Sequence, residues 1–277
     1  MSGNVLKKAF IAAASLAGLK SGLVPVAPRL TVYDLATAKW PESYAPLHIA
    51  IATDMHVGCP SVPLDHVDEI VRRLNALTPD VIILPGDFLC SPMPLGRYVA
   101  PQAIAERLGA LKAKHGVYAV LGNHEWYEDG PGMWAALEQN NIRVLENDAV
   151  KISPDHQDIW IAGLADDKTR TPDIKAAFDK VTGPGPVVMI CHDPGTFHDL
   201  DERAVVTISG HTHGGQVKIP FAGVVHLPSR APLRWAYGHI REQNRDLIVS
   251  AGLGTSSLPL RFGVPPEIVS LTLRPGR

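Results

Sequence analysis

The sequence predicts an α/β fold in which layers of β-sheet and helix pack on one another. From Leu47 onward, short apolar runs alternate with amphipathic helical stretches, which is the pattern of such folds. Hydrophobic residues make up 45% of the 277 residues, so a chain of this size can bury a large core without disulfide staples. Its 24 glycines and 24 prolines follow no period and predict many structured loops.

The elements follow from the spacing of apolar residues along the chain. Continuous apolar runs predict buried strands at residues 47–52, 80–84 and 117–121, near Arg143, Val150 and Trp160, and at residues 186–191 and 204–209. Apolar residues that recur every third or fourth position predict helices at residues 63–77, 100–114 and 132–140. The turn-rich C-terminal third, residues 214–273, predicts an antiparallel second sheet.

Residues 1–27 form a segment that is similar to a secretory signal or a membrane anchor. Lys7 and Lys8 precede an apolar run over residues 9–19, as in such signals. The alternative is a short helix packed on the domain or lying at a membrane interface. Residues 28–46 are expected as an extended lead-in and residues 47–277 as the main domain. We therefore expect a membrane-associated or exported bacterial protein, with a cytoplasmic one as the alternative.

Net charge and cysteine content limit the binding partners and structural sites that the sequence is compatible with. A net charge of −2 gives no basic field, which disfavours nucleic acid. The three cysteines include no pair at metal-ligand spacing, which argues against a zinc knuckle or a disulfide scaffold. Cys59, Cys90 and Cys191 are expected as small buried thiols, although Cys59 and Cys90 could form a disulfide if the protein is exported.

Metal-ligand side chains follow five of the predicted strands. They are Asp54 and His56, Asp87, Asn123, His192, and His211 with His213. In sheets of this kind, ligands bind beyond the carboxyl ends of the strands, so these side chains should meet at one edge. In Asp54-x-His56, as in His211-x-His213, side chains two positions apart would lie on one face of an extended segment.

This donor set points to a pair of divalent cations. Carboxylates brought close together repel each other, and cations relieve that repulsion. Two ions about 3.5–4 Å apart need a bridging oxygen ligand and several terminal nitrogen or oxygen ligands each. Imidazole with carboxylate, and without thiolate, favours zinc, iron, nickel or manganese over calcium or magnesium.

The order of these motifs resembles the calcineurin-like metallophosphoesterase superfamily. The motifs are Asp54-x-His56, Gly86-Asp87, Gly122-Asn123-His124-Glu125, His192 and Gly210-His211-x-His213. The resemblance runs from residue 47 to 273 and implies a four-layer α/β/β/α sandwich of two mixed sheets flanked by helices. Residues 210–216, 252–255 and 265–267 are similar to a bacterial branch of exported or membrane-associated phosphodiesterases, which includes UDP-2,3-diacylglucosamine pyrophosphatase-like enzymes.

The resemblance also implies an activity and the role of each site residue. It implies a dimetal hydrolase of phosphodiester or pyrophosphate bonds, acting on a small-molecule or lipid-linked substrate with two ions of manganese, iron or zinc. Asp54, His56 and His213 would bind one ion, Asn123, His192 and His211 the other, and Asp87 would bridge them. A hydroxide shared by the ions would attack phosphorus, and His124 would protonate the leaving oxygen as a general acid.

One position departs from the family pattern. Many members carry an acidic residue three positions after the bridging aspartate, where it orients the histidine that serves as general acid. Here that position is Cys90. We expect either Asp193 or Glu125 to orient His124 instead, or the general acid to matter less.

Two stretches are expected to border the pocket because each follows a metal motif. Residues 88–101 and 219–235 are rich in apolar side chains, and the second includes Arg230 and Arg234. These arginines are expected to grip a substrate phosphate, with ordinary loop packing as the alternative. Two other functions stay open, namely a phosphomonoesterase of the same fold and a non-catalytic phosphoesterase-like scaffold that binds partners.

Overall fold

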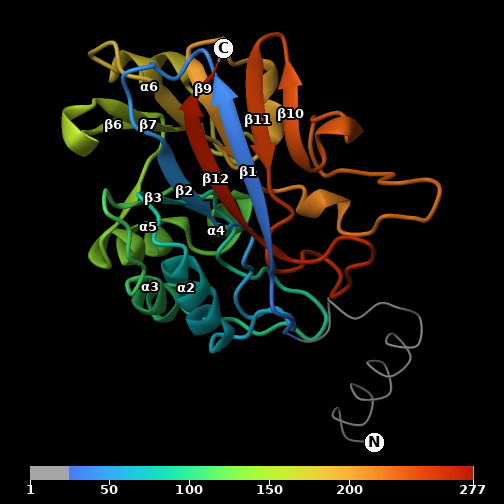
Figure 1. Cartoon of the computed structure of the whole chain (residues 1–277). Coiled ribbons are helices and arrows are strands. Elements are labelled where there is room, and N and C mark those ends of the chain that lie inside the picture. Colours follow the sequence, from blue (N-terminus) through green and yellow to red (C-terminus); the bar gives the residue numbers. More distant parts are fainter. Residues whose placement is uncertain (1–24, 277) are drawn as a thin grey trace, which may run out of the picture.

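The computed structural model describes residues 25–276, which form two six-stranded mixed sheets packed between layers of helix (Figure 1). This arrangement confirms the four-layer α/β/β/α prediction. The apolar segment predicted within residues 1–27 lies outside the described residues, apart from its last three positions. No helix within residues 25–276 has the length and apolar character needed to cross a bilayer.

The first sheet has the strand order β1-β12-β2-β3-β4-β5. Its strands are β1 (Arg29–Thr37), β12 (Glu267–Pro275), β2 (Leu47–Ile51), β3 (Val81–Leu84), β4 (Val117–Ala119) and β5 (Ile142–Val144). The strands from β2 to β5 run parallel, whereas β12 is antiparallel to β2 and parallel to β1.

The second sheet has the strand order β10-β11-β9-β8-β7-β6. Its strands are β10 (Gly238–Glu242), β11 (Arg245–Val249), β9 (Ala204–Ser209), β8 (Val187–Ile190), β7 (Ile159–Gly163) and β6 (Asp148–Ile152). The four central strands are parallel, and an antiparallel strand closes each edge.

The apolar runs of the sequence are explained by strands whose two faces are both buried. In β2, Ile49 and Ile51 point between the sheets, and Ala50 points toward the helices. In β3, Val81 and Ile83 enter the layer between the sheets, while Ile82 and Leu84 face the helices. Because alternate side chains point to opposite faces, a strand buried on both faces reads as a continuous apolar run.

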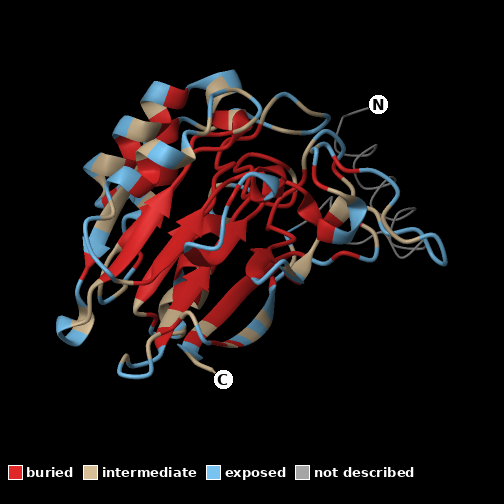
Figure 2. Cartoon of the chain, turned by 90° about the horizontal axis from the view of Figure 1, so that it is seen from above, coloured by how far each residue is buried: buried red, intermediate tan, exposed pale blue. Residues whose placement is uncertain are grey.

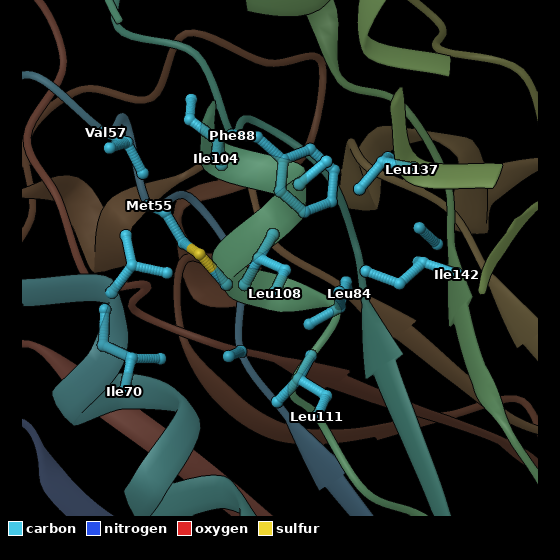
Figure 3. Close-up of a cluster of buried hydrophobic side chains, with 14 of the residues drawn as sticks. Met55, Val57, Ile70, Leu84, Phe88, Ile104, Leu108, Leu111, Leu137 and Ile142 are labelled. Carbon is cyan, nitrogen blue, oxygen red and sulfur yellow. The ribbon is translucent and has the colours of Figure 1, made fainter. Parts of the chain in front are cut away.

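Helices cover the outer face of each sheet. They are α2 (His66–Ala76), α3 (Pro101–Leu108), α4 (Asn123–Glu128), α5 (Gly130–Gln139) and α6 (Ile174–Asp179), with short 3-10 turns η1 (Pro154–His156), η2 (Pro194–His198), η3 (His213–Gly215) and η4 (Leu233–Trp235). Figure 3 shows the core under the first set of helices, where Ile70 of α2 and Ile104 and Leu108 of α3 gather near Met55 and Phe88. The inner strands of both sheets are almost wholly buried, whereas the edge strands β1, β6 and β10 carry exposed or intermediate residues. The other exposed residues gather on outer helix faces and loops (Figure 2).

The C-terminal third corrects one expectation. Residues 214–273 do not form an antiparallel second sheet of their own, because their strands join both sheets. β12 enters the first sheet between β1 and β2, and β11 pairs in parallel with β9 and antiparallel with β10. Local pattern indicates a strand but does not specify its partner, which is set by contacts distant in sequence.

Four other elements differ from the prediction. The expected lead-in at residues 28–46 contains β1, which pairs with β12 along its whole length. The helix expected at residues 100–114 ends at Leu108, where Gly109 is the C-cap. The helices α4 and α6 are too short, at six residues each, for a helical period to stand out in the sequence.

Candidate metal centre

All seven predicted ligands are buried and meet at one place. They follow β2, β3, β4, β8 and β9 at the carboxyl ends of these strands, and two of them, Asn123 and His213, are the first residues of α4 and η3. None of the seven (Asp54, His56, Asp87, Asn123, His192, His211 and His213) is more than 4% exposed. Two sheets therefore bring one set of polar side chains into an otherwise apolar interior.

The ligand atoms fall into two groups that share Asp87. In each group, the nitrogen or carboxylate oxygen atoms all lie within 4.8 Å of one another. One group consists of Asp54, His56, Asp87 and His213, and the other of Asp87, His192 and His211. Asn123 lines the same cleft as Asp87 and His211.

One carboxylate oxygen of Asp87 faces histidines of both ligand groups. Its Oδ2 is 3.5 Å from His56 Nε2 and 3.2 Å from His192 Nε2. Its Oδ1 accepts a hydrogen bond from the backbone N–H of His124 at 3.0 Å. Burial alone would raise the pKa of Asp87, but the neighbouring His192, His124 and His56 outweigh it and hold the pKa well below its usual value. The shared residue is therefore a carboxylate, as a bridging ligand must be.

Backbone carbonyls orient three of the four imidazoles. His56 Nδ1 lies 3.1 Å from Leu89 O, His192 Nδ1 2.7 Å from Pro85 O, and His211 Nε2 2.9 Å from Pro228 O. Because a carbonyl oxygen can only accept, each of these ring nitrogens must donate its proton outward. When such a ring is neutral, its opposite nitrogen directs its lone pair into the cluster, as in ligating histidines generally.

His213 is oriented differently, by a buried arginine. Arg261 is 1% exposed, and its guanidinium lies 3.1 Å from His213 Nδ1. The same guanidinium donates to the carbonyls of Ala251 and Gly254. Burial first, and then His56 and Arg261, hold the pKa of His213 well below its usual value. The ring therefore stays neutral, which is the form that binds a metal.

The ligand loops adopt an unusual backbone. Five of the seven residues have left-handed conformations, with φ of 51° at Asp54, 44° at His56, 56° at Asp87, 65° at His211 and 50° at His213. The expectation that side chains two apart share one face of an extended segment is therefore wrong, because these segments are not extended. Left-handed turns aim the side chains inward instead, and such strain is found mainly at functional sites.

The donor set fits two divalent cations. The Oδ1 atom of Asn123 is buried and has no hydrogen-bond partner among residues 25–276, which is costly unless something else satisfies it. His56 Nε2 and His213 Nε2 lie 3.0 Å apart, so these two ring nitrogens point to the same place in the cluster. Nitrogen and oxygen donors without thiolate are those that transition-metal ions and zinc prefer.

His124 lies in the cleft beside both groups and belongs to neither. Its ring packs edge-on against His56 with centroids 4.5 Å apart. Its Nε2 is 3.3 Å from Ser256 Oγ, and its Nδ1 is buried without a hydrogen-bond partner in the described part of the chain. The side chain is therefore placed at the centre with one nitrogen unused.

Neither carboxylate expected to orient His124 contacts it. Asp193 accepts hydrogen bonds from Ser229 Oγ and the backbone N–H of Gly195. Glu125 accepts from three backbone N–H groups instead, those of Asp87 at 2.9 Å, Leu89 at 2.9 Å and Gly122 at 2.8 Å. Within residues 25–276, Ser256 is the side chain that hydrogen-bonds the His124 ring, and no local pattern predicts this contact because the two residues lie 132 positions apart.

The three cysteines are free and buried, so the alternative of a Cys59–Cys90 disulfide is not realised in the structure. Cys90 donates to Ser91 O, and burial raises the pKa of its thiol to about 12. A neutral thiol cannot supply the negative charge of the acidic residue that it replaces.

A cleft of about 470 Å³ opens onto the centre. Beside the metal-site residues, it is lined by Ser91, Tyr127, Lys168, Thr212, Gly215, Gln216, His226, Pro228, Ser256 and Ser257. The lysine in this lining, Lys168, is exposed, and its Nζ donates a hydrogen bond to Pro228 O at 2.8 Å. Arg230 and Arg234 are not among the lining residues.

The two arginines expected to grip phosphate are engaged elsewhere. Arg230 forms ion pairs with Asp167, at 2.7 Å, and with Asp199. Arg234 pairs with Glu242 at 2.6 Å. The prediction that these arginines border the pocket is wrong. Closeness to a metal motif in the sequence does not show which carboxylate a long arginine side chain pairs with.

Comparison with known proteins identifies relatives along most of the chain. The model of the calcineurin-like phosphoesterase family matches residues 47–215. An uncharacterised metallophosphoesterase of Helicobacter pylori is 32% identical over 237 residues, which cover 83% of this chain and 60% of that protein. A transmembrane protein with metallophosphoesterase domain from Danio rerio is 28% identical over 285 residues, covering 98% of this chain and 62% of that protein.

The chain thus spans about 60% of the length of these two relatives. Among solved structures, the NAD nucleotidase of Haemophilus influenzae superimposes with a TM-score of 0.49 at 14% sequence identity. The superposition covers 76% of this chain and 51% of that one.

Glu125 is predicted to hold the loops after β3 and β4 together. In Glu125→Gln, the side-chain amide would present N–H groups to a backbone N–H donor that now meets a carboxyl oxygen. We expect the free energy of unfolding to fall by about 1–3 kcal/mol, the cost of leaving a buried hydrogen-bond donor unsatisfied. Urea denaturation of metal-free protein measures it, with the exposed Glu128→Gln as the matched control. An unchanged midpoint would contradict this role.

Proposed function

The chain belongs to the calcineurin-like phosphoesterase family, and we propose that it hydrolyses phosphodiester or pyrophosphate bonds with two divalent metal ions. The observation that carries this proposal is the pair of ligand groups that share the Asp87 carboxylate. A single structural ion would need one such group, whereas two adjacent ions are the arrangement of many phosphoryl-transfer sites.

The ligand roles follow the two groups. Asp54, His56 and His213 would hold one ion, Asn123, His192 and His211 the other, and Asp87 both. When bound, such ions supply a nucleophilic water and offset negative charge on the phosphoryl oxygens. Manganese, iron or zinc suits this mixture of imidazole and carboxylate.

His124 would act as the general acid. Its ring lies at the cleft beside the ligands, and its half-buried position leaves it open to substrate. From there it can donate a proton to the oxygen that leaves phosphorus, which improves a poor leaving group. Ser256 would position the ring, in the place of the carboxylate that the family pattern supplies.

The proposal also includes the type of bond that is cleaved and the class of substrate. A phosphomonoesterase of the same fold is the alternative. The cleft favours a larger substrate, because it extends from His124 past Tyr127 to Lys168 and His226 on its rim. The similarity of residues 210–216 to UDP-2,3-diacylglucosamine pyrophosphatase-like enzymes supports a pyrophosphate or lipid-linked substrate, whereas the names of the two relatives above specify no substrate.

We also propose that the protein works at a membrane or is exported. The signal-like pattern of residues 1–27 supports this localisation, as does the name of the Danio rerio relative, which is a transmembrane protein. Cytoplasmic localisation is the alternative. Fractionation of cells into soluble, membrane and exported material would separate these possibilities.

Metal removal tests the dimetal proposal. Protein prepared with chelator should be inert on bis-p-nitrophenyl phosphate, because the ions supply both the nucleophile and the charge stabilisation. Activity should return with manganese at lower concentration than with magnesium. Full activity in excess EDTA after dialysis would refute the proposal, and metal-loaded protein that is inert on every phosphoester would favour the non-catalytic scaffold.

His124→Ala tests the general acid. We expect kcat to fall by about 10²–10⁴-fold while the metal content stays the same, because His124 belongs to neither ligand group. The matched control is His226→Ala, which removes another histidine of the cleft that lies on its exposed rim. Loss of metal from His124→Ala would assign this residue to the ligands instead.

Lys168→Ala tests where a second substrate phosphate lies. We expect KM for a pyrophosphate substrate to rise by about tenfold, with little change for bis-p-nitrophenyl phosphate, because one lysine–phosphate contact contributes about 1–2 kcal/mol. Arg230→Ala is the control, since Arg230 is paired with Asp167 and Asp199. Equal losses on both substrates, or a larger effect of Arg230→Ala, would contradict this assignment.

A further inference from the structure

A short hairpin projects from the molecule beside the cleft. Ile219 and Gly223 exchange backbone hydrogen bonds, N–H to O, at 2.9 and 2.8 Å, and Phe221 lies at the turn between them. Below the turn, the backbone N–H of Lys218 donates to Phe262 O at 2.8 Å, which ties the hairpin to a neighbouring loop. In Figure 1 this segment is the orange loop that extends away from the sheets. We refer to residues 218–225 as the cleft hairpin.

The tip of the cleft hairpin is apolar and faces solvent. Phe221 is fully exposed, with Val225 at 57% and Ile219 at 42%. Two apolar side chains on adjacent segments, Leu233 and Leu258, are exposed as well. Phe221 also has a left-handed backbone, with φ of 67°, which is uncommon for a bulky residue. Grouped apolar residues on a surface mark a site of interaction, whereas a single one does not.

The chain segments that carry this tip and the neighbouring exposed apolar residues contain no acidic residue. The sequence has no Asp or Glu from Arg203 to Arg241, nor from Ser250 to Pro266. Lys218, at the base of the turn, is exposed and forms no ion pair with any residue in the described range 25–276. An apolar tip next to an unpaired cation is complementary to an anionic lipid surface, where acyl chains lie beneath negative head groups.

The cleft hairpin also forms part of the wall of the cleft. Gln216, just before it, and His226, just after it, both line the cleft that leads to the metal centre. Gln216 donates through Nε2 to the carbonyls of Ser256 and Leu258 and accepts from Ser256 N–H, so the base of the hairpin is fixed to the same loop that contacts His124. A surface that takes up the tip would therefore lie at the mouth of the cleft.

We propose that the cleft hairpin inserts its apolar tip into an anionic lipid bilayer, with Phe221 among the acyl chains and Lys218 at the head groups. This contact is made by residues within the described range 25–276. It does not depend on the proposed activity. It would place the mouth of the cleft at the membrane surface, within reach of phosphate groups carried by lipids.

A fluorophore at the tip tests this contact in the full chain. Phe221→Cys is labelled with an environment-sensitive dye, since the three native cysteines are buried. The probe is vesicles of phosphatidylcholine with phosphatidylglycerol, compared with phosphatidylcholine alone. We expect the emission to shift to the blue with anionic vesicles and to be quenched by lipids that carry a quencher in their acyl chains. Thr182→Cys, exposed just before β8 at the opposite end of that strand from the metal centre, should not respond.

Two outcomes would overturn the proposal. If the protein sediments with vesicles while the emission at position 221 stays unchanged, the membrane contact lies elsewhere. If the emission shifts with protein concentration in the absence of lipid, the tip binds a second copy of the chain and not a bilayer.

A charge variant tests the role of Lys218 separately. In the labelled protein, Lys218→Gln should raise the lipid concentration for half-maximal response by about fivefold, because each basic residue near an anionic surface contributes about 1 kcal/mol. Lys180→Gln, which removes an exposed lysine after α6, should leave it unchanged. Equal shifts in both variants would mean that only net charge matters and would contradict insertion at this hairpin. Thermal melting confirms that each variant is folded.

Discussion

The site depends on hydrogen bonds that lock the strand-end loops to one another. The backbone N–H groups of Asp54 and His56 donate to the carbonyls of Gly86 and Asp87, so the loops after β2 and β3 run side by side. Glu125, after β4, accepts the backbone N–H groups of Asp87 and Gly122, and so joins the loop after β4 to the loop after β3. The carboxylate of Asp54 accepts the backbone N–H of His211 at 2.9 Å, which joins the loop after β9 to the loop after β2. Without these bonds, the left-handed ligand residues would have no reason to keep their strained conformations.

Glycines in the motifs make room for this convergence. A Cβ atom on Gly122 would overlap Asp87 Oδ1 and the ring of His192, and one on Gly210 would overlap Asp54 Oδ2. The Gly-Asn-His and Gly-His-x-His motifs therefore combine a ligand with the space that the neighbouring ligand needs. Lack of space for a Cβ atom therefore explains why glycine precedes the ligand at these two positions. Neither glycine has a left-handed backbone, so backbone conformation is not the reason.

Much of the site could be predicted because its residues follow apolar runs that are easy to recognise. Each run is buried on both faces, as in β2 and β3, and the polar residue after it must leave the sheet at the carboxyl edge. The long-range features could not be predicted. The partner of β12, the contact of Ser256 with His124 and the ion pairs of Arg230 all join residues far apart in sequence, and no local pattern encodes them.

The substitution at Cys90 shows how one position can change without loss of the surrounding geometry. Its thiol is neutral and packs in the core beneath the helices, where an unpaired carboxylate would be costly. His124 is instead held by contacts on its two sides, the His56 ring and Ser256 Oγ. The general acid would then be positioned by a hydroxyl and not by a carboxylate.

The pairing of β1 with β12 constrains how the chain matures. Arg29 is opposite Glu267 in the register, and β12 also separates β1 from β2. During synthesis, β1 therefore leaves the ribosome long before β12, its neighbour in the sheet, exists, and this edge of the first sheet can form only after residue 275 has been added. Contacts of such long sequence separation form slowly. Until then, the edges of β1 and β2 that pair with β12 have no partner strand.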